Sequence, residues 1–112
     1  MTLLLHRGFF AAEVKQTPLF KIPSLGENVS LICSHEDSSF IYKYWYRQEK
    51  GKALVFIGQM YRETVTMDTL VENKMSIKPD GFMKSLLTIH NFMVEDSAAY
   101  YCASSIHSEM IA

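Results

Sequence analysis

The sequence predicts an all-β protein, a sandwich of two antiparallel sheets. Short runs of alternating apolar and polar residues are separated by turn residues, and no stretch has the periodicity of an amphipathic helix. Tyr100 and Cys102 are two positions apart and therefore share one face of a strand, from which the cysteine can reach a facing sheet. The tyrosine hydroxyl can return to the backbone at the preceding corner. Cys33 and Trp45 supply a second cysteine and a large aromatic side chain for the space between the sheets.

Size and charge exclude several classes of protein. The chain has 112 residues, enough for one domain with its own core. Hydrophobic residues make up 48% and charged residues 21%, which is typical of a globular protein. The net charge is −1 without a basic block, so nucleic acid is not an expected partner. No apolar run approaches the roughly 20 residues of a membrane span, so a membrane protein would need an anchor outside this sequence.

The two cysteines can be free thiols or one disulfide. They are too few for a zinc site, and there is no Cys-x-x-Cys for redox chemistry. The neighbouring Trp45 and Tyr100 favour a single bridge from Cys33 to Cys102. Closing so long a loop would stabilise the domain by about 4 kcal/mol if the effect is chain entropy.

The first 12 residues have features of a secretory leader. Leu3, Leu4 and Leu5 form an apolar run, and Ala11-Ala12 before Glu13 is a possible cleavage site. We expect residues 1–12 to be a leader or its remnant outside the fold, and 13–105 to form the domain. Residues 106–112 then follow as a tail.

Strands are expected in short segments from Val14 onward. Pro18 and Pro23 confine the first segment to the edge of a sheet, because proline cannot donate to a ladder. Gly51 is expected to supply the positive φ of a hairpin turn. The other expected strands cover residues 29–34, 41–48, 53–60, 64–68, 74–78, 83–89 and 96–104.

These residues carry a specific resemblance. Cys33, Trp45 and the run Asp96-x-Ala98-x-Tyr100-x-Cys102 resemble an immunoglobulin variable-type domain, a sandwich with Greek-key connections. Gln16-Thr17-Pro18, Trp45-Tyr46-Arg47-Gln48 and Cys102-Ala103-Ser104-Ser105 are similar to the beta chain of the T-cell receptor. The resemblance implies a core that includes Trp45, Leu87, Asp96 and Tyr100. It implies no cofactor.

The resemblance also implies the binding surfaces. The first two hypervariable loops of that family mainly meet the helices of a major-histocompatibility molecule, and the third meets the bound peptide. The first loop would contain Asp37, Ser38, Ser39, Phe40, Ile41 and Tyr42, the second Gln59, Met60, Tyr61, Arg62 and Glu63, and the third would begin with Ser104, Ser105 and Ile106. An alpha-chain variable domain would pair with Tyr46, Gln48, Leu54 and Tyr101.

The residue types fit these roles in part. Phe40, Tyr42, Met60 and Tyr61 are aromatic or adaptable side chains in expected loops, where they could supply contact area. Tyr46, Gln48 and Tyr101 have the outward parity of their strands and can form one patch. The alternative is that these tyrosines reflect strand propensity alone.

Two departures from the family pattern stand out. Lys74 replaces the usual arginine; it can still pair with Asp96 but lacks the bidentate fork. The sequence reaches Ala112 without Phe-Gly-x-Gly, so the last strand is expected to be missing and the edge of the 96–104 strand to be bare. His107-Ser108-Glu109 is what the recombination signal beside an unrearranged receptor segment, CAC AGT G, would encode if it were read straight through. We therefore expect 106–112 to be germline read-through, the alternative being a truncated third loop.

The sequence contains one modification motif and no catalytic motif. Asn28-Val29-Ser30 is an N-glycosylation sequon with Asn28 expected to face water. There is no Gly-x-Ser-x-Gly, His-Glu-x-x-His or phosphate-binding glycine loop, so an enzyme is not expected. His35-Glu36-Asp37 fits a solvated loop better than a metal site. An antibody light-chain variable domain and a free-standing adhesion domain remain alternative functions.

Overall fold

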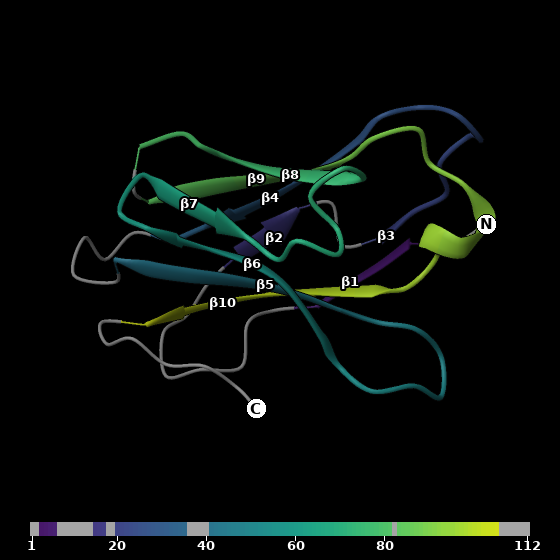
Figure 1. Ribbon diagram of the computed structural model, residues 1–112, viewed down its shortest axis with the longest axis horizontal. Coiled ribbons are helices and arrows are strands. Elements are labelled where there is room, and N and C mark those ends of the chain that lie inside the picture. The colour runs from purple at the N-terminus through teal and green to yellow at the C-terminus, as the bar shows by residue number, and fades with distance from the viewer. Residues whose placement is uncertain (1–2, 7–14, 18–19, 36–40, 82, 106–112) are drawn as a thin grey trace.

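The computed structural model describes residues 3–6, 15–17, 20–35, 41–81 and 83–105, with side chains from Ile22 onward. Two sheets pack face to face (Figure 1). Their strands are β1 (Leu3–His6), β2 (Lys15–Thr17), β3 (Phe20–Lys21), β4 (Val29–Ser34), β5 (Tyr42–Gln48), β6 (Val55–Tyr61), β7 (Thr64–Met67), β8 (Met75–Pro79), β9 (Lys84–Ile89) and β10 (Ala99–Ser105). A short 3-10 turn, Val94–Asp96, precedes β10.

The strand order confirms the predicted sandwich. One sheet has the order β3-β1-β10-β5-β6-β7, and the other β2-β4-β9-β8. The chain crosses between the sheets from β4 to β5 and from β9 to β10, as Greek-key connections require. Each strand expected from residue 29 onward is present. The last begins only at Ala99, because Asp96 belongs to the preceding 3-10 turn.

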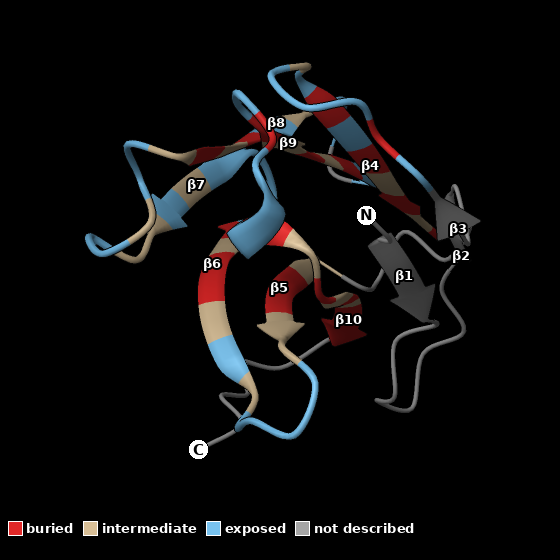
Figure 2. Ribbon diagram, turned by 90° about the vertical axis from the view of Figure 1, so that its right-hand side faces the viewer, coloured by how far each residue is buried: buried red, intermediate tan, exposed pale blue. Residues whose placement is uncertain are grey.

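Alternating side chains build the core between the sheets. Along β4, Val29, Leu31 and Cys33 are fully buried and alternate with more exposed residues (Figure 2). Leu31 pairs with Leu87 of β9, which is also fully buried, so both strands turn the same face inward. Trp45 and Tyr100 fill the centre from the other sheet, as predicted.

Gly58 makes possible a close contact between β6 and its neighbours. The β5–β6 ladder shifts register between Trp45 and Tyr46, and Gly58 lies opposite Trp45. A Cβ at Gly58 would lie 2.8 Å from Ile77 Cδ1 and 2.9 Å from the carbonyl oxygen of Thr66. Both distances are too short for carbon to occupy without movement.

We expect Gly58→Ala to lower the free energy of unfolding by roughly 1–3 kcal/mol, because the added methyl overpacks the core. Urea denaturation of the parent and the variant measures the change. In an Ile77→Val background, which removes Cδ1, the cost should fall but not vanish, because the backbone oxygen of Thr66 remains. Equal urea midpoints for the parent and the Gly58→Ala chain would contradict the close contact.

The structure of Leu3–His6 differs from two expectations, that this segment lies outside the fold and that the edge of the last strand is bare. Leu3–His6 forms β1, so these residues lie within the fold and not outside it. β1 pairs in parallel with β10, from Leu4 opposite Ala99 to His6 opposite Tyr101, whereas the other ladders are antiparallel among the described strands. The edge of β10 is therefore not bare along Ala99–Tyr101. The physical reason is that a strand edge offers unpaired backbone groups, which any extended segment within reach can satisfy.

Candidate functional site

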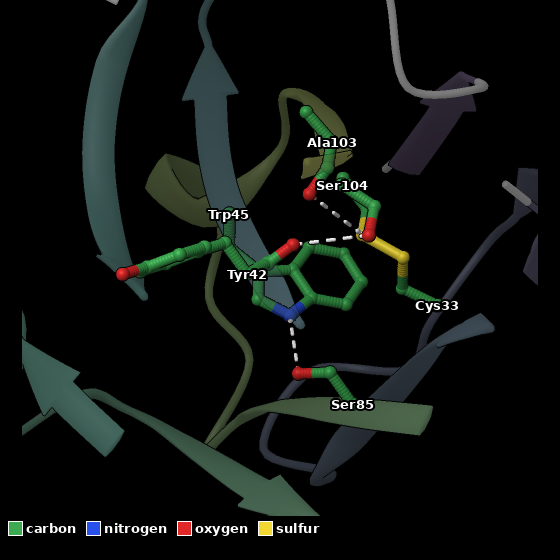
Figure 3. Close-up of a disulfide and its surroundings, with 7 residues drawn as sticks. Cys33, Tyr42, Trp45, Ser85, Ala103 and Ser104 are labelled. Carbon is green, nitrogen blue, oxygen red and sulfur yellow. Dashed lines mark hydrogen bonds between the residues drawn. A yellow bond between two sulfur atoms is a disulfide. The ribbon is translucent and has the colours of Figure 1, made fainter. Parts of the chain in front are cut away.

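A disulfide and a tryptophan join the two sheets. Cys33 of β4 and Cys102 of β10 form the predicted disulfide, with Cα atoms 6.1 Å apart, which excludes two free thiols. Trp45 lies directly opposite Cys102 in the β10–β5 ladder, and its ring lies beside the bridge (Figure 3). The indole Nε1 donates to Ser85 Oγ at 2.9 Å. Sequence reasoning missed Ser85, although a buried tryptophan N–H requires an acceptor.

The corner before β10 is fixed by Tyr100 and Asp96. The Tyr100 hydroxyl donates to the backbone oxygen of Asp96 at 2.8 Å, as predicted. Asp96 Oδ2 accepts from the Met93 N–H and pairs with Lys74 Nζ, both at 2.9 Å, so lysine does make the expected ion pair. Burial raises the pKa of the Tyr100 phenol well above its usual value, so the hydroxyl stays protonated and able to donate.

We expect Tyr100→Phe to lower the free energy of unfolding by about 1–2 kcal/mol, because it leaves the Asp96 carbonyl without its donor. Chemical denaturation checks the loss. Tyr101→Phe is the matched control on the same strand: its hydroxyl is 3.4 Å from Gln48 Oε1 and only partly buried, so the expected change is below about 0.5 kcal/mol. Equal losses for the two variants would show that the corner hydrogen bond adds nothing.

Part of the expected antigen surface is visible at the loop end of the larger sheet. Tyr42 and Tyr61 are opposite each other in the β5–β6 ladder, with ring centroids 4.9 Å apart. Arg62 follows in the turn to β7 with a φ of 52°, and its guanidinium lies 5.7 Å from the Tyr61 ring centroid. We call Tyr42, Tyr61 and Arg62 the loop-end patch. It joins residues of the first and second predicted loops, which sequence alone could not place side by side.

Several predicted loop residues have a different environment. The prediction that Met60 is a contact residue is wrong. Met60 lies within β6 and is fully buried, because neighbouring side chains on a strand point to opposite faces and that of Tyr61 points outward. Ser104 and Ser105 are also buried, in β10, and Ser104 Oγ donates to the Tyr42 carbonyl at 3.0 Å. β10 therefore continues through Ser105, so the third loop cannot begin with exposed Ser104.

The remaining loop positions divide between described and undescribed segments. Ile41 is half-buried before β5, and Gln59 is half-buried within β6 rather than in a loop. Glu63 is exposed in the turn after Arg62. Asp37, Ser38, Ser39, Phe40, Ile106 and the tail 106–112 lie outside the described residues.

The predicted partner face is only partly available. Tyr46 is opposite Tyr101 in the β10–β5 ladder, and the Tyr101 hydroxyl is 3.4 Å from Gln48 Oε1, so the three residues do share one face. Gln48 and Tyr101 are half-buried, and so is Leu54 just before β6. Tyr46, however, is 2% exposed, which corrects the expectation that it offers contact area.

Neighbouring β6 residues explain this correction. Phe56 is opposite Tyr46 in the β5–β6 ladder, and the two rings are 5.7 Å apart. Val55, beside it in sequence, is 49% exposed. Sequence reasoning missed Phe56, although it shares the parity of Leu54 and could have been assigned to the same face. We call Gln48, Leu54, Phe56 and Tyr101 the partner face.

Lys43 is a third residue that sequence reasoning missed. Its side chain is fully buried, and within the described part of the chain Nζ has no hydrogen-bond partner. Burial lowers the pKa of this amine from 10.5 to about 8. The signal was available, because Lys43 precedes the inward Trp45 by two positions and so has the same parity.

Among the described residues, no group of three or more His, Cys, Asp or Glu side chains could hold a metal ion. Of the run His35-Glu36-Asp37, the structure describes only His35, which is buried. In the same described ranges, no helix has the length and apolar character needed to cross a membrane.

The inter-sheet disulfide, its tryptophan and the tyrosine corner define an immunoglobulin variable-type domain. A sequence model of the immunoglobulin V-set domain matches residues 17–111. Human T cell receptor beta variable 2 is 36% identical over 104 residues, which cover 91% of this chain and 89% of the relative. Human T cell receptor beta variable 7-2 is 35% identical over 104 residues, 92% of this chain and 90% of the relative. The chain therefore belongs to the immunoglobulin V-set family, and within it to the T-cell receptor beta variable domains.

Proposed function

We propose that this domain recognises antigen as part of a T-cell receptor beta chain, pairing with an alpha-chain variable domain and contacting a peptide bound to a major-histocompatibility molecule. The observation that carries the proposal is the pairing of two separate surfaces on one sheet, the partner face and the loop-end patch. The comparisons favour neither an antibody light chain nor a free-standing adhesion domain.

The partner face has the composition of a protein interface. Leu54, Phe56 and Tyr101 contribute apolar and aromatic surface, and none of its four residues is charged. Interface centres are typically depleted of charge and enriched in aromatic residues. Gln48 adds a polar group whose Nε2 already donates to the Lys52 carbonyl at 3.0 Å, which fixes the direction of its amide.

The loop-end patch suits antigen contact. Tyrosine and arginine are enriched among residues that contribute most to binding energy, because they offer large contact area with few freely rotating bonds. The Tyr42 and Tyr61 rings pack against each other at a tilt of 40°, and this contact holds both rings in place before binding. Residues 37–40 and those after Ser105 are proposed to complete this surface.

Sedimentation of the chain with alpha-chain variable domains tests the pairing. The chain is used with and without an added Phe-Gly-x-Gly strand, and we expect a heterodimer once that strand is present. Leu54→Asp should weaken the heterodimer at least about tenfold, because a charge would be buried in the interface. Leu70→Asp is the matched control, since Leu70 is 88% exposed and outside the partner face.

A soluble monomer in every mixture would contradict the proposed pairing and favour a free-standing immunoglobulin domain. Equal heterodimer affinities for the two aspartate variants would contradict the assigned face. Binding to peptide complexes is then measured on the heterodimer, where Arg62→Ala should weaken binding without affecting pairing.

We also propose that the domain matures in the secretory pathway, functions on the outer face of the cell and carries a glycan at Asn28. Asn28 is exposed, and its Oδ1 accepts from the Asn91 N–H at 3.0 Å, while a glycan would attach to the other amide atom. After expression in secretory cells, glycosidase should reduce the mass of the parent chain but not of Ser30→Ala. An unchanged parent mass would contradict the proposal.

A further inference from the structure

β1 fills a space one strand wide between β3 and β10 (Figure 1). Leu4 is paired on both sides, opposite Phe20 of β3 and opposite Ala99 of β10. Neighbouring strands lie about 4.8 Å apart, so β3 and β10 are separated by roughly 10 Å, the width of a single inserted strand. Without β1, two strand edges would face each other across this space with unpaired backbone groups. We call the space bounded by β3 and β10 the strand slot.

A strand that returns from the end of β10 has only this slot to enter. A strand has two edges, and β5 pairs along one edge of β10 from Ala99 to Ser105. β1 pairs along the other edge from Ala99 to Tyr101. An antiparallel strand that returns from Ser105 can therefore pair along the whole of β10 only by taking the place of β1. Under the proposed function, that strand is the joining strand with Phe-Gly-x-Gly.

We propose that β1 is a placeholder in the strand slot and that the joining strand displaces it. The inference rests on the proposed function, which supplies the joining strand, and it adds a step to the assembly of the domain. The predicted cleavage site, Ala11-Ala12, lies between β1 and β2 in sequence, so processing would remove the placeholder and open the slot. A chain that keeps residues 1–12 and has no joining strand keeps this edge of β10 covered.

Chain entropy favours the joining strand over β1. Pairing of β1 with β10 closes a loop that contains nearly the whole chain, whereas a hairpin closes only a few residues. Even through the bridge between Cys33 and Cys102, the path from β1 to β10 is much longer than a hairpin loop. The cost of closing a loop rises with its length, and parallel pairing is slightly less stable per residue than antiparallel pairing. Both effects drive the exchange once a joining strand is present.

The strand slot borders the partner face. His6 of β1 is opposite Tyr101, which belongs to that face, so the strand that fills the slot lies beside Tyr101 in the same sheet. Side chains of a strand alternate between the two faces of its sheet, so those on the outer side extend the partner face by one strand. Replacing β1 by the joining strand therefore changes the surface offered to an alpha-chain domain.

Hydrogen exchange of the backbone amides reads the replacement directly. The parent chain and the same chain extended by a joining strand are refolded with residues 1–12 retained, and exchange is followed by mass spectrometry. We expect the amides of β1 to be protected in the parent and to exchange at least about tenfold faster in the extended chain. Amides of residues 99–101 should be protected in both. β1 amides that stayed protected in the extended chain, or that were unprotected in the parent, would overturn the proposal.

A proline in β1 gives a second readout. Leu4→Pro removes a backbone N–H and disrupts the pairing of β1, so it should lower the melting temperature of the parent by on the order of 5 °C. Leu4→Val is the matched control, because it keeps the N–H and a side chain that favours strands. In the extended chain, Leu4→Pro should change the melting temperature by less than about 1 °C. Equal changes in the two chains, including none in either, would contradict a shared slot.

Both readouts use the chain without a partner, so they separate this inference from the proposed function. The proposed function fails if no alpha-chain variable domain pairs with the extended chain in sedimentation. The exchange of strands fails if β1 stays protected in that chain. An extended chain that pairs while its β1 stays protected would refute the exchange and leave the proposed function standing.

Discussion

Removing the bridge between Cys33 and Cys102 is expected to lower the free energy of unfolding by about 4 kcal/mol. The cysteines are separated by 69 positions, and freeing so long a loop gives the unfolded chain many more conformations. A single domain of this size is typically stable by only about 5–15 kcal/mol, so the loss removes a large share of the total. Urea denaturation of the parent and the Cys33→Ala, Cys102→Ala double variant measures it.

Two controls separate the bridge from the packing around it. Ser85→Ala removes the acceptor of the Trp45 N–H while the disulfide stays intact, and should cost only about 1–2 kcal/mol. Reducing agent should destabilise the parent but leave the double variant unchanged, because the variant has no bridge to break. A double variant no less stable than Ser85→Ala would contradict the expected role of the long loop.

The core residues could be predicted because side chains alternate between the two faces of a strand. Once Cys102 is inward, Tyr100 on the same strand must also be inward, and the facing sheet must supply Cys33. Trp45 then has only one space large enough for its ring. Each such inference uses the alternation within one strand, so it still holds when the predicted ends of that strand are wrong by a few residues.

The surface depends on relations between strands and was less predictable. Tyr46 has outward parity but is covered, because Phe56 of β6 packs beside it after the register shift between Trp45 and Tyr46. Met60 was assigned to the second loop by the resemblance, although it ended the strand expected over 53–60; β6 in fact continues to Tyr61, which pairs with Thr64 across a two-residue turn. The side chain alternation of an extended β6 then buries Met60.

The pairing of β1 with β10 was beyond sequence reasoning for a similar reason. The two strands are at opposite ends of the chain, and parallel pairing leaves no hairpin signal between them. Lys43 shows a different limit. The alternation of side chains along β5 predicts that Lys43 points inward, whereas its charge predicts that it lies at the surface. In the structure Lys43 is buried, so the alternation prevails.

Lys43→Met is expected to raise the free energy of unfolding at pH 7 by about 3 kcal/mol. The folded-state pKa is about 8 against 10.5 for a free lysine, and each unit corresponds to about 1.4 kcal/mol. At pH 7 the amine is protonated in both states, so the folded chain bears the full cost of a buried charge. Methionine fills the same space without that charge and can pack beside Met60.

The pH dependence identifies the cause. Below pH 8 lysine is protonated in both states, so the advantage of methionine is constant. Between pH 8 and 10.5 the unfolded parent keeps the proton that the folded parent has released, so parent stability rises with pH and the advantage shrinks. Above 10.5 both states are neutral and the charge effect is gone. Urea midpoints of the two chains across this range measure the difference, in which titrations common to both chains cancel.

Two further variants make this result specific to Lys43. His35 is another buried ionisable side chain of the described chain, so the series is repeated in a His35→Gln background and should keep its shape. Lys78→Met, on an exposed position of β8, should change stability little at any pH. A methionine advantage that persisted above pH 10.5 would assign the gain to packing rather than to charge.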